Sequence, residues 1–190
     1  LERHSEGLVC LAACLSGEIA LWLRSDRYED ARSTAEWMAR TFAPGDFFLE
    51  VQSHGIPEEG LVKEGMVRLS RELGLPIVAT NDAHYLRRED AEAHDVLLAI
   101  GTGADLDDPK RFRFTGQESY VKSEAEMRAL FPDLPESISQ TQSVADRCEF
   151  RPGDYFEIDV EAASYDIVVL GHICRAEGAD GAQRLIRRAF

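Results

Sequence analysis

The sequence predicts an α/β protein with a parallel sheet, and two observations carry that prediction. Short apolar runs rich in β-branched residues alternate with longer stretches in which apolar residues recur at helical spacing. Only a few residues connect each run to the next, as in βαβ units. Because the strands expected before Gly101 are too few to close a barrel, we expect the chain to be part of a larger fold.

The strands and helices of the first half are predicted from this alternation. Residues 7–15 form a small-residue apolar run that reads as a buried strand, and residues 26–42 follow with helical spacing. Residues 46–53 alternate between two faces and form the second predicted strand. A helix over residues 58–73 comes next, and Gly74 ends it.

The third predicted strand begins at Leu75 and runs into a polar end at Asn81, Asp82 and His84. A helix follows it, with acidic residues in the first turn, where the positive end of the helix dipole favours them. The buried side of this helix is expected to consist of Val96, Leu97, Leu98 and Ile100.

The character of the chain changes after this helix. Residues 105–114 form a charged loop, and two helix-like stretches follow at 123–130 and 136–148. Nearer the C-terminus, we expect a buried strand at 165–170 and a short helix at 182–190.

The loop contains the cluster Lys110-Arg111-Phe112-Arg113-Phe114, which interleaves basic and aromatic residues. Such a composition can stack on single-stranded nucleic acid. In so acidic a chain, we instead expect the cluster to pair with neighbouring carboxylates and to anchor its two rings in the core.

The overall composition is that of a globular protein: 44% of the 190 residues are apolar and 29% are charged. The formal net charge of −14 predicts little nucleic-acid binding by this chain alone, because phosphate binding relies on a positive field. The four cysteines form no CxxC pair, so reduced thiols are expected. No stretch has the length of a membrane span or the layout of a signal peptide, which predicts a cytoplasmic location without membrane contact.

Asp82 and His84 are the main candidates for chemistry. Because strand side chains alternate with a period of two, both are expected on the same side at the end of the third strand. A carboxylate and an imidazole on one face make half of a divalent-metal site, and ligands of α/β proteins collect at such strand ends. The alternative is a pair that only caps the following helix and hydrogen-bonds a loop.

Three further residues near the strand ends are weaker candidates. Asn81 precedes the pair and could line the site. His54 follows the second strand and could lean toward the same mouth with Glu50 and Gln52, although a histidine that only packs in the turn is more frequent. Cys14, near the end of the first strand, belongs to a residue type that is more often part of the core than a ligand.

Several common chemistries lack their motif in this sequence. It contains no GxSxG elbow, no Walker loop, no GxGxxG and no HExxH. This excludes most of the common hydrolase and nucleotide-binding classes.

The chain resembles the bacterial DNA polymerase III alpha subunits in five segments, taken in order and spacing: LERHSEGLVCLAACLSGEI, VQSHGIPEE, LGLPIVATNDAHYLRREDAEAHDVLLAIGTG, LDDPKRFRF and YVKSEAEMRALFPD. The likeness covers approximately residues 3–150. It points to the second half of the N-terminal polymerase-and-histidinol-phosphatase (PHP) domain. It implies part of a distorted (β/α)7 barrel at residues 1–104 and a helical linker toward the polymerase palm at 105–150, and it leaves 151–190 unassigned.

The resemblance also implies a cluster of divalent metals, Zn, Mn or Mg, at the mouth of the barrel. On matching positions, Asp82 and His84 are the final DxH motif of its ligands, and Cys14 in CLSGE is an earlier ligand. No ligand role is carried over to His54. The opening HxH motif of the family, its Asp-His motif and the palm with its catalytic aspartates have no counterpart in this sequence.

For the parent enzyme, the resemblance implies template-directed deoxynucleotidyl transfer, with DNA and deoxynucleotides as substrates and Mg²⁺ held outside this segment. Other replicase subunits are implied as partners. The metal cluster would hydrolyse phosphodiesters as a 3′–5′ exonuclease, and the fragment itself is expected to be inactive. A stand-alone PHP phosphoesterase is an alternative that the helices after Gly101 disfavour, and a purely structural interaction domain is another.

Overall fold

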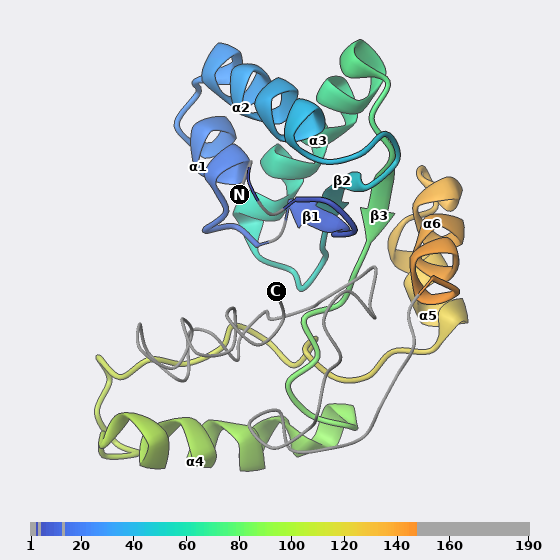
Figure 1. Cartoon of the computed structure of the whole chain (residues 1–190). Coiled ribbons are helices and arrows are strands. Elements are labelled where there is room, and N and C mark those ends of the chain that lie inside the picture. Colours follow the sequence, from blue (N-terminus) through green and yellow to red (C-terminus); the bar gives the residue numbers. More distant parts are fainter. Residues whose placement is uncertain (1–2, 4, 13, 148–190) are drawn as a thin grey trace.

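The computed structural model describes residues 3, 5–12 and 14–147, and it contains a three-stranded parallel sheet. The strands β1 (Cys10–Ala12), β2 (Phe47–Val51) and β3 (Ile77–Ala79) lie side by side in that order (Figure 1). In the middle strand, Leu49 pairs with Ala12 on one side and with Ile77 on the other. The predicted α/β class with parallel strands is confirmed, and in the described part of the chain the sheet is open.

Three helices of the first half surround this sheet: α1 (Glu18–Arg24), α2 (Tyr28–Thr41) and α3 (Pro57–Leu73). The sequence patterns predicted α2 and α3 to within two residues at each end, and Gly74 ends α3 in the left-handed conformation with φ of 66°. The helix α1 was not predicted. Its seven residues are too few for a clear helical period, yet they bury Ile19, Ala20 and Leu23.

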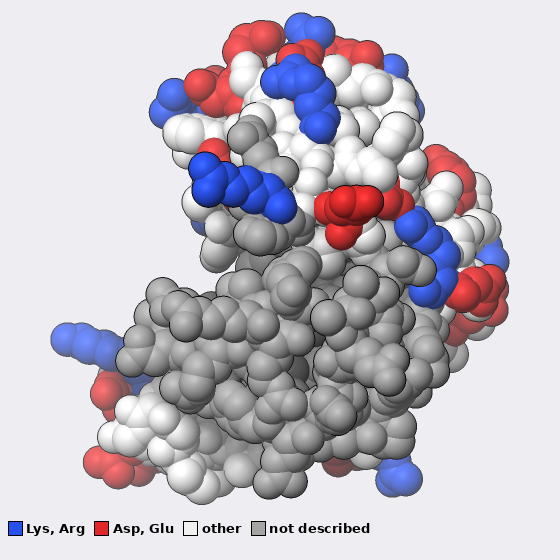
Figure 2. All heavy atoms as spheres, viewed as in Figure 1, with Lys and Arg blue, Asp and Glu red and all other residues white. Residues whose placement is uncertain are grey.

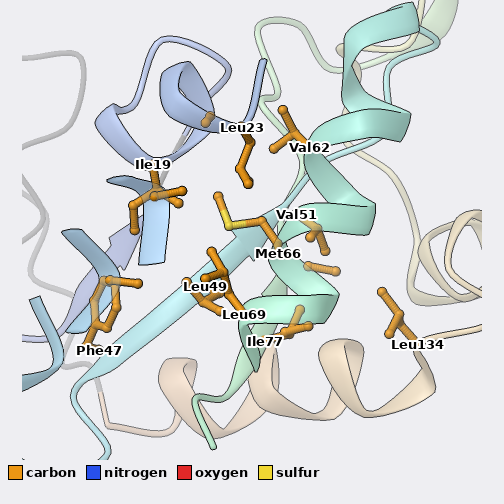
Figure 3. Close-up of a cluster of buried hydrophobic side chains, with 14 of the residues drawn as sticks. Ile19, Leu23, Phe47, Leu49, Val51, Val62, Met66, Leu69, Ile77 and Leu134 are labelled. Atoms are coloured by element: carbon orange, nitrogen blue, oxygen red, sulfur yellow. The ribbon is translucent and has the colours of Figure 1, made fainter. Parts of the chain in front are cut away.

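The hydrophobic core lies between the sheet and these helices, as the close-up in Figure 3 shows. Leu49 of β2 and Met66 and Leu69 of α3 are almost wholly buried at its centre. All five residues of β2 are buried, as expected for a central strand of a parallel sheet. The strand β1 is shorter than predicted and only half-buried, because it forms an edge of the sheet in the described part.

The second half of the described chain contains a single 3₁₀ turn, η1 (Arg88–Asp90), and the helices α4 (Ala91–Thr102), α5 (Glu124–Leu130) and α6 (Pro135–Ala145). The two last helices lie beside β3 in Figure 1 and agree with the predicted stretches. Thr141 of α6 donates a hydrogen bond from its hydroxyl to the carbonyl of Ala79, at 2.7 Å. The helices that follow the charged loop therefore return to the sheet.

The buried side predicted for α4 is largely wrong. Leu97 is 64% exposed and Ile100 is 72% exposed, and Val96 is exposed as well. The helix lies apart from the sheet in Figure 1 and packs against the loop that follows it. Its covered side therefore consists of Ala91, His94, Asp95, Leu98 and Ala99.

The described surface carries mixed charges. Figure 2 shows acidic and basic side chains next to one another over the upper helices. Several of them form ion pairs within or between helices, such as Arg68 with Glu72 at 2.8 Å. Among the described residues, no helix is both long and apolar enough to cross a membrane. The strand predicted at 165–170 and the helix at 182–190 lie outside the described residues.

Candidate metal centre

Asp82 and His84 lie together just beyond the carboxyl end of β3. The Oδ1 atom of Asp82 is 3.1 Å from Nε2 of His84. Two donors that share one metal ion, each about 2.1 Å from it, lie roughly 3 to 3.5 Å apart in octahedral or tetrahedral geometry. The observed separation is that of a direct contact between carboxylate and imidazole, and it also fits two ligands of one divalent cation.

The backbone and the ring of His84 are both held by the segment that follows α4. The amide of His84 donates to the carbonyl of Ser119 at 2.7 Å, and the neighbouring Tyr85 forms a parallel bridge with Tyr120. The ring of Phe114 meets the His84 ring edge-on, with 4.6 Å between ring centres. These contacts set the direction in which the imidazole points.

His94 of α4 completes this aromatic group, with its ring centre 5.4 Å from that of His84. Burial lowers the pKa of His94, and the adjacent His84 lowers it further. Of the two rings predicted to anchor in the core, only Phe114 is half-buried, whereas Phe112 is 59% exposed. The predicted burial of both rings is therefore wrong for Phe112, because its side chain projects from the surface of the loop.

The prediction that the cluster pairs with carboxylates is confirmed by Arg111. Its guanidinium makes a bidentate contact with Asp95 of α4, with Nη1 2.7 Å from Oδ1. Hydrogen bonding to Arg111 holds the pKa of Asp95 below its usual value. The pair therefore ties the loop to α4 beside the candidate centre.

His54 lies just beyond the end of β2, and its ring contacts the backbone of Asp82. Its ring is buried, with Nδ1 2.8 Å from Oε1 of Glu59. On the other side of the ring, the amide of Asp82 donates to Nε2 at 3.2 Å. Burial alone would raise the pKa of Glu59, but hydrogen bonds from His54 and from the amide of Ile56 outweigh it and lower the pKa.

Asn81 contacts the segment that also holds the backbone of His84. Its amide nitrogen donates to the carbonyl of Tyr120 at 2.5 Å, and its oxygen accepts a bond from Lys122 at 3.2 Å. The side chain thus joins the end of β3 to residues 118–122.

Cys14 lines a hollow whose polar neighbours are Glu50, Gln52, Glu59 and Lys63. Cys14 adopts a left-handed backbone conformation, with φ of 68°, and its Sγ accepts a bond from the amide of Ser16 at 3.5 Å. Within residues 3, 5–12 and 14–147, no three His, Cys, Asp or Glu side chains cluster closely enough to hold a metal ion. The structure therefore brings Asp82 and His84 together, and among the described residues Cys14 does not join them in a three-ligand group.

Glu50 is a buried acid of β2. Its position near the candidate site was predicted only from the alternation of side chains along the strand. Glu50 is 7% exposed, it accepts a hydrogen bond from Thr80, and Gln52 approaches it at 3.4 Å. Burial raises the pKa of Glu50, against the Thr80 bond, and the Asp82 carboxylate raises it further. Burial and Glu50 together raise the pKa of Cys10 to about 11.

Sequence reasoning missed Glu59 and Phe114 as neighbours of the site. The position of Glu59 could have been found, because an acid shortly after Pro57 at a helix start is the pattern of an N-terminal cap. No local pattern predicts the contact of Phe114 with His84, because the two residues lie far apart in the sequence and only the tertiary fold brings them together.

Comparisons with known proteins identify relatives for most of the chain. Residues 1–54 match the family model of the PHP domain. Over 78% of its length, the chain is 45% identical to the DNA polymerase III subunit alpha of Borreliella burgdorferi and 42% identical to that of Campylobacter jejuni. The same subunit of Thermus aquaticus is 42% identical, again over 78% of this chain. The chain spans 13%, 13% and 12% of the lengths of these three relatives.

Proposed function

Because this chain is homologous over 78% of its length to one segment of the DNA polymerase III alpha subunits, we propose that it is part of such a replicative polymerase. In this proposal it contributes a portion of a PHP metal-binding domain, at residues 1–104, and the connection toward the palm, at 105–150. That homology is the observation that carries the proposal. Deoxynucleotidyl transfer on DNA, with Mg²⁺ and partner subunits, belongs to the rest of the longer protein.

For the PHP portion, we propose binding of Zn, Mn or Mg and a 3′–5′ exonuclease reaction. Asp82 supplies a hard anionic oxygen and His84 a neutral imidazole nitrogen, and their 3.1 Å separation supports a shared cation. Cys14 supplies a thiolate to the wider cluster, and the remaining ligands come from outside this chain. Divalent cations, when bound, provide Lewis acidity for phosphodiester hydrolysis.

The metal content of the full-length polypeptide tests this proposal. Mass spectrometry of purified wild type, Asp82→Asn and His84→Ala proteins should show metal in the wild type and a clear loss in both variants. Asp107→Asn is the matched control, because Asp107 is exposed on the loop after α4. Equal metal content in all four proteins would overturn the metal role.

Two activity measurements separate the remaining candidates. The full-length wild type should shorten a 5′-labelled single-stranded DNA from its 3′ end in the presence of the metal, and Asp82→Asn should not. The 190-residue chain alone should show no primer extension, and extension by it would refute its assignment as part of a larger polymerase. A domain with a structural role is the second candidate, favoured by the presence of only two clustered ligands in the described part, and it predicts neither metal nor nuclease activity.

A further inference from the structure

We propose that His54 and Glu59 form a positioning pair that fixes the backbone of Asp82 and thereby the geometry of the Asp82 and His84 ligands. The inference rests on the proposed metal site. It assigns His54 a role beside the metal rather than on it, and it gives Glu59 a part in the site. Neither residue is a catalytic group in this proposal.

The hydrogen bonds of the His54 ring allow one neutral tautomer. Since the amide of Asp82 donates to Nε2 at 3.2 Å, that nitrogen must present its lone pair. The ring proton then resides on Nδ1, which donates to Oε1 of Glu59 at 2.8 Å. Both nitrogens are engaged, so His54 could bind a metal only by giving up its contact with Asp82.

Glu59 fixes the ring from the first turn of α3. Its Oε2 accepts a bond from the backbone amide of His54 at 2.7 Å and another from that of Ile56 at 3.1 Å. The Glu59 side chain is itself only 9% exposed. One carboxylate therefore holds both the ring and the turn that carries it, which leaves His54 little freedom to rotate.

Asp82 needs such a support because the sheet ends before it. The last sheet bond of this strand runs from the amide of Thr80 to the carbonyl of Val51, at 3.1 Å. Beyond that point, His54 provides the acceptor for the amide of Asp82, while the carboxylate stays 3.1 Å from His84. Partners that orient metal ligands in this way commonly change metal affinity by about 10- to 100-fold when they are removed.

Co²⁺ titration of the full-length polypeptide, followed by the visible absorption of the bound ion, tests the inference. His54→Ala should weaken binding by about 10-fold or more and change the absorption spectrum. His54→Gln, which can offer an amide oxygen to Asp82, should recover part of the affinity. Glu58→Gln is the matched control for Glu59→Gln, because Glu58 is exposed on the same helical turn.

The outcomes distinguish this inference from the proposed function. If His54→Ala and Glu59→Gln reduce the melting temperature but leave Co²⁺ affinity and spectrum unchanged, the pair is only structural and the inference is overturned. If Asp82→Asn also leaves binding unchanged, the metal site itself is absent and both proposals fall. Should the alanine variant fail to fold, ¹⁵N spectra of the wild-type chain still decide, since a ring proton on Nε2 of His54 would overturn the inference.

Discussion

Arg111 and Asp95 face each other in a bidentate ion pair between the charged loop and α4, with Nη1 2.7 Å from Oδ1. This pair closes the loop at residues 105–114 over the side of α4 that carries His94. The loop in turn places the ring of Phe114 against His84. A contact far from the sheet therefore supports the candidate metal centre.

Asp95→Asn should loosen this loop, because the substitution removes the charge and one of the two carboxylate oxygens that accept from Arg111. We expect backbone amides in residues 105–114 to exchange with solvent about tenfold faster, as measured by hydrogen–deuterium exchange. Asp107→Asn, an exposed change in the same loop, should leave exchange unaltered. Unchanged protection in the Asp95 variant would show that the pair does not hold the loop.

Phe114→Ala should lower the free energy of unfolding by about 1 kcal/mol or more, because the ring loses its edge contacts with His84 and His94. Urea denaturation measures this change. Phe112→Ala is the control from the same loop, since its ring is 59% exposed, and it should cost no more than about 0.5 kcal/mol. Equal costs for the two variants would contradict the supporting role of Phe114.

The two glycines within α3 should respond to alanine in opposite directions. At Gly65, an added Cβ would lie 2.6 Å from Cδ2 and 3.0 Å from Cγ of the buried Leu23. Gly65→Ala is therefore expected to destabilise the protein by about 1 to 3 kcal/mol through overpacking. At Gly60, no atom lies within 4 Å, so Gly60→Ala should stabilise the helix by about 0.5 to 1 kcal/mol.

Thermal unfolding of both variants tests the packing of α1 on α3. A gain in stability for both would mean that Leu23 moves aside at no cost. A loss of stability for both would instead mean that an added Cβ at Gly60 is not in open space.

Glu50 should make stability depend on pH in the direction opposite to that of an ordinary ion-paired carboxylate. Because its pKa is raised above 4.5 in the folded state, the folded protein retains a proton that the unfolded chain has already lost. The stabilisation that Glu50 contributes is fully present below pH 4.5. It declines as the pH rises through the raised pKa of Glu50 in the folded state. Urea midpoints of Glu50→Gln should therefore vary less over this range and exceed those of the wild type at about pH 8.

Glu64→Gln is the control for that experiment, since Glu64 is an exposed acid of α3. It should follow the wild-type pH dependence. If the Glu50 variant has the same slope as the wild type, the buried carboxyl does not retain its proton.

Local patterns were sufficient for the elements with a long period or a clear stop. The helix α3 shows this best, because its apolar spacing, Pro57 at its start and Gly74 at its end all act within a few residues. The same reasoning failed for α4. Leu97 and Ile100 are apolar, but their burial depends on which surface the helix packs against. That surface is the loop after α4, and the sequence pattern of α4 does not predict the path of that loop.

The sequence by itself determined the α/β class, the parallel direction of the strands and the presence of Asp82 and His84 at a strand end, because these follow from alternation and helical period. Only the tertiary structure decided that the two donors lie 3.1 Å apart, that Cys14 borders a hollow with Glu50 and Glu59, and that His54 accepts a hydrogen bond from the amide of Asp82. The reason is physical: hydrogen bonds between strand ends depend on how the sheet and the later segments pack, and those contacts join residues far apart in the chain.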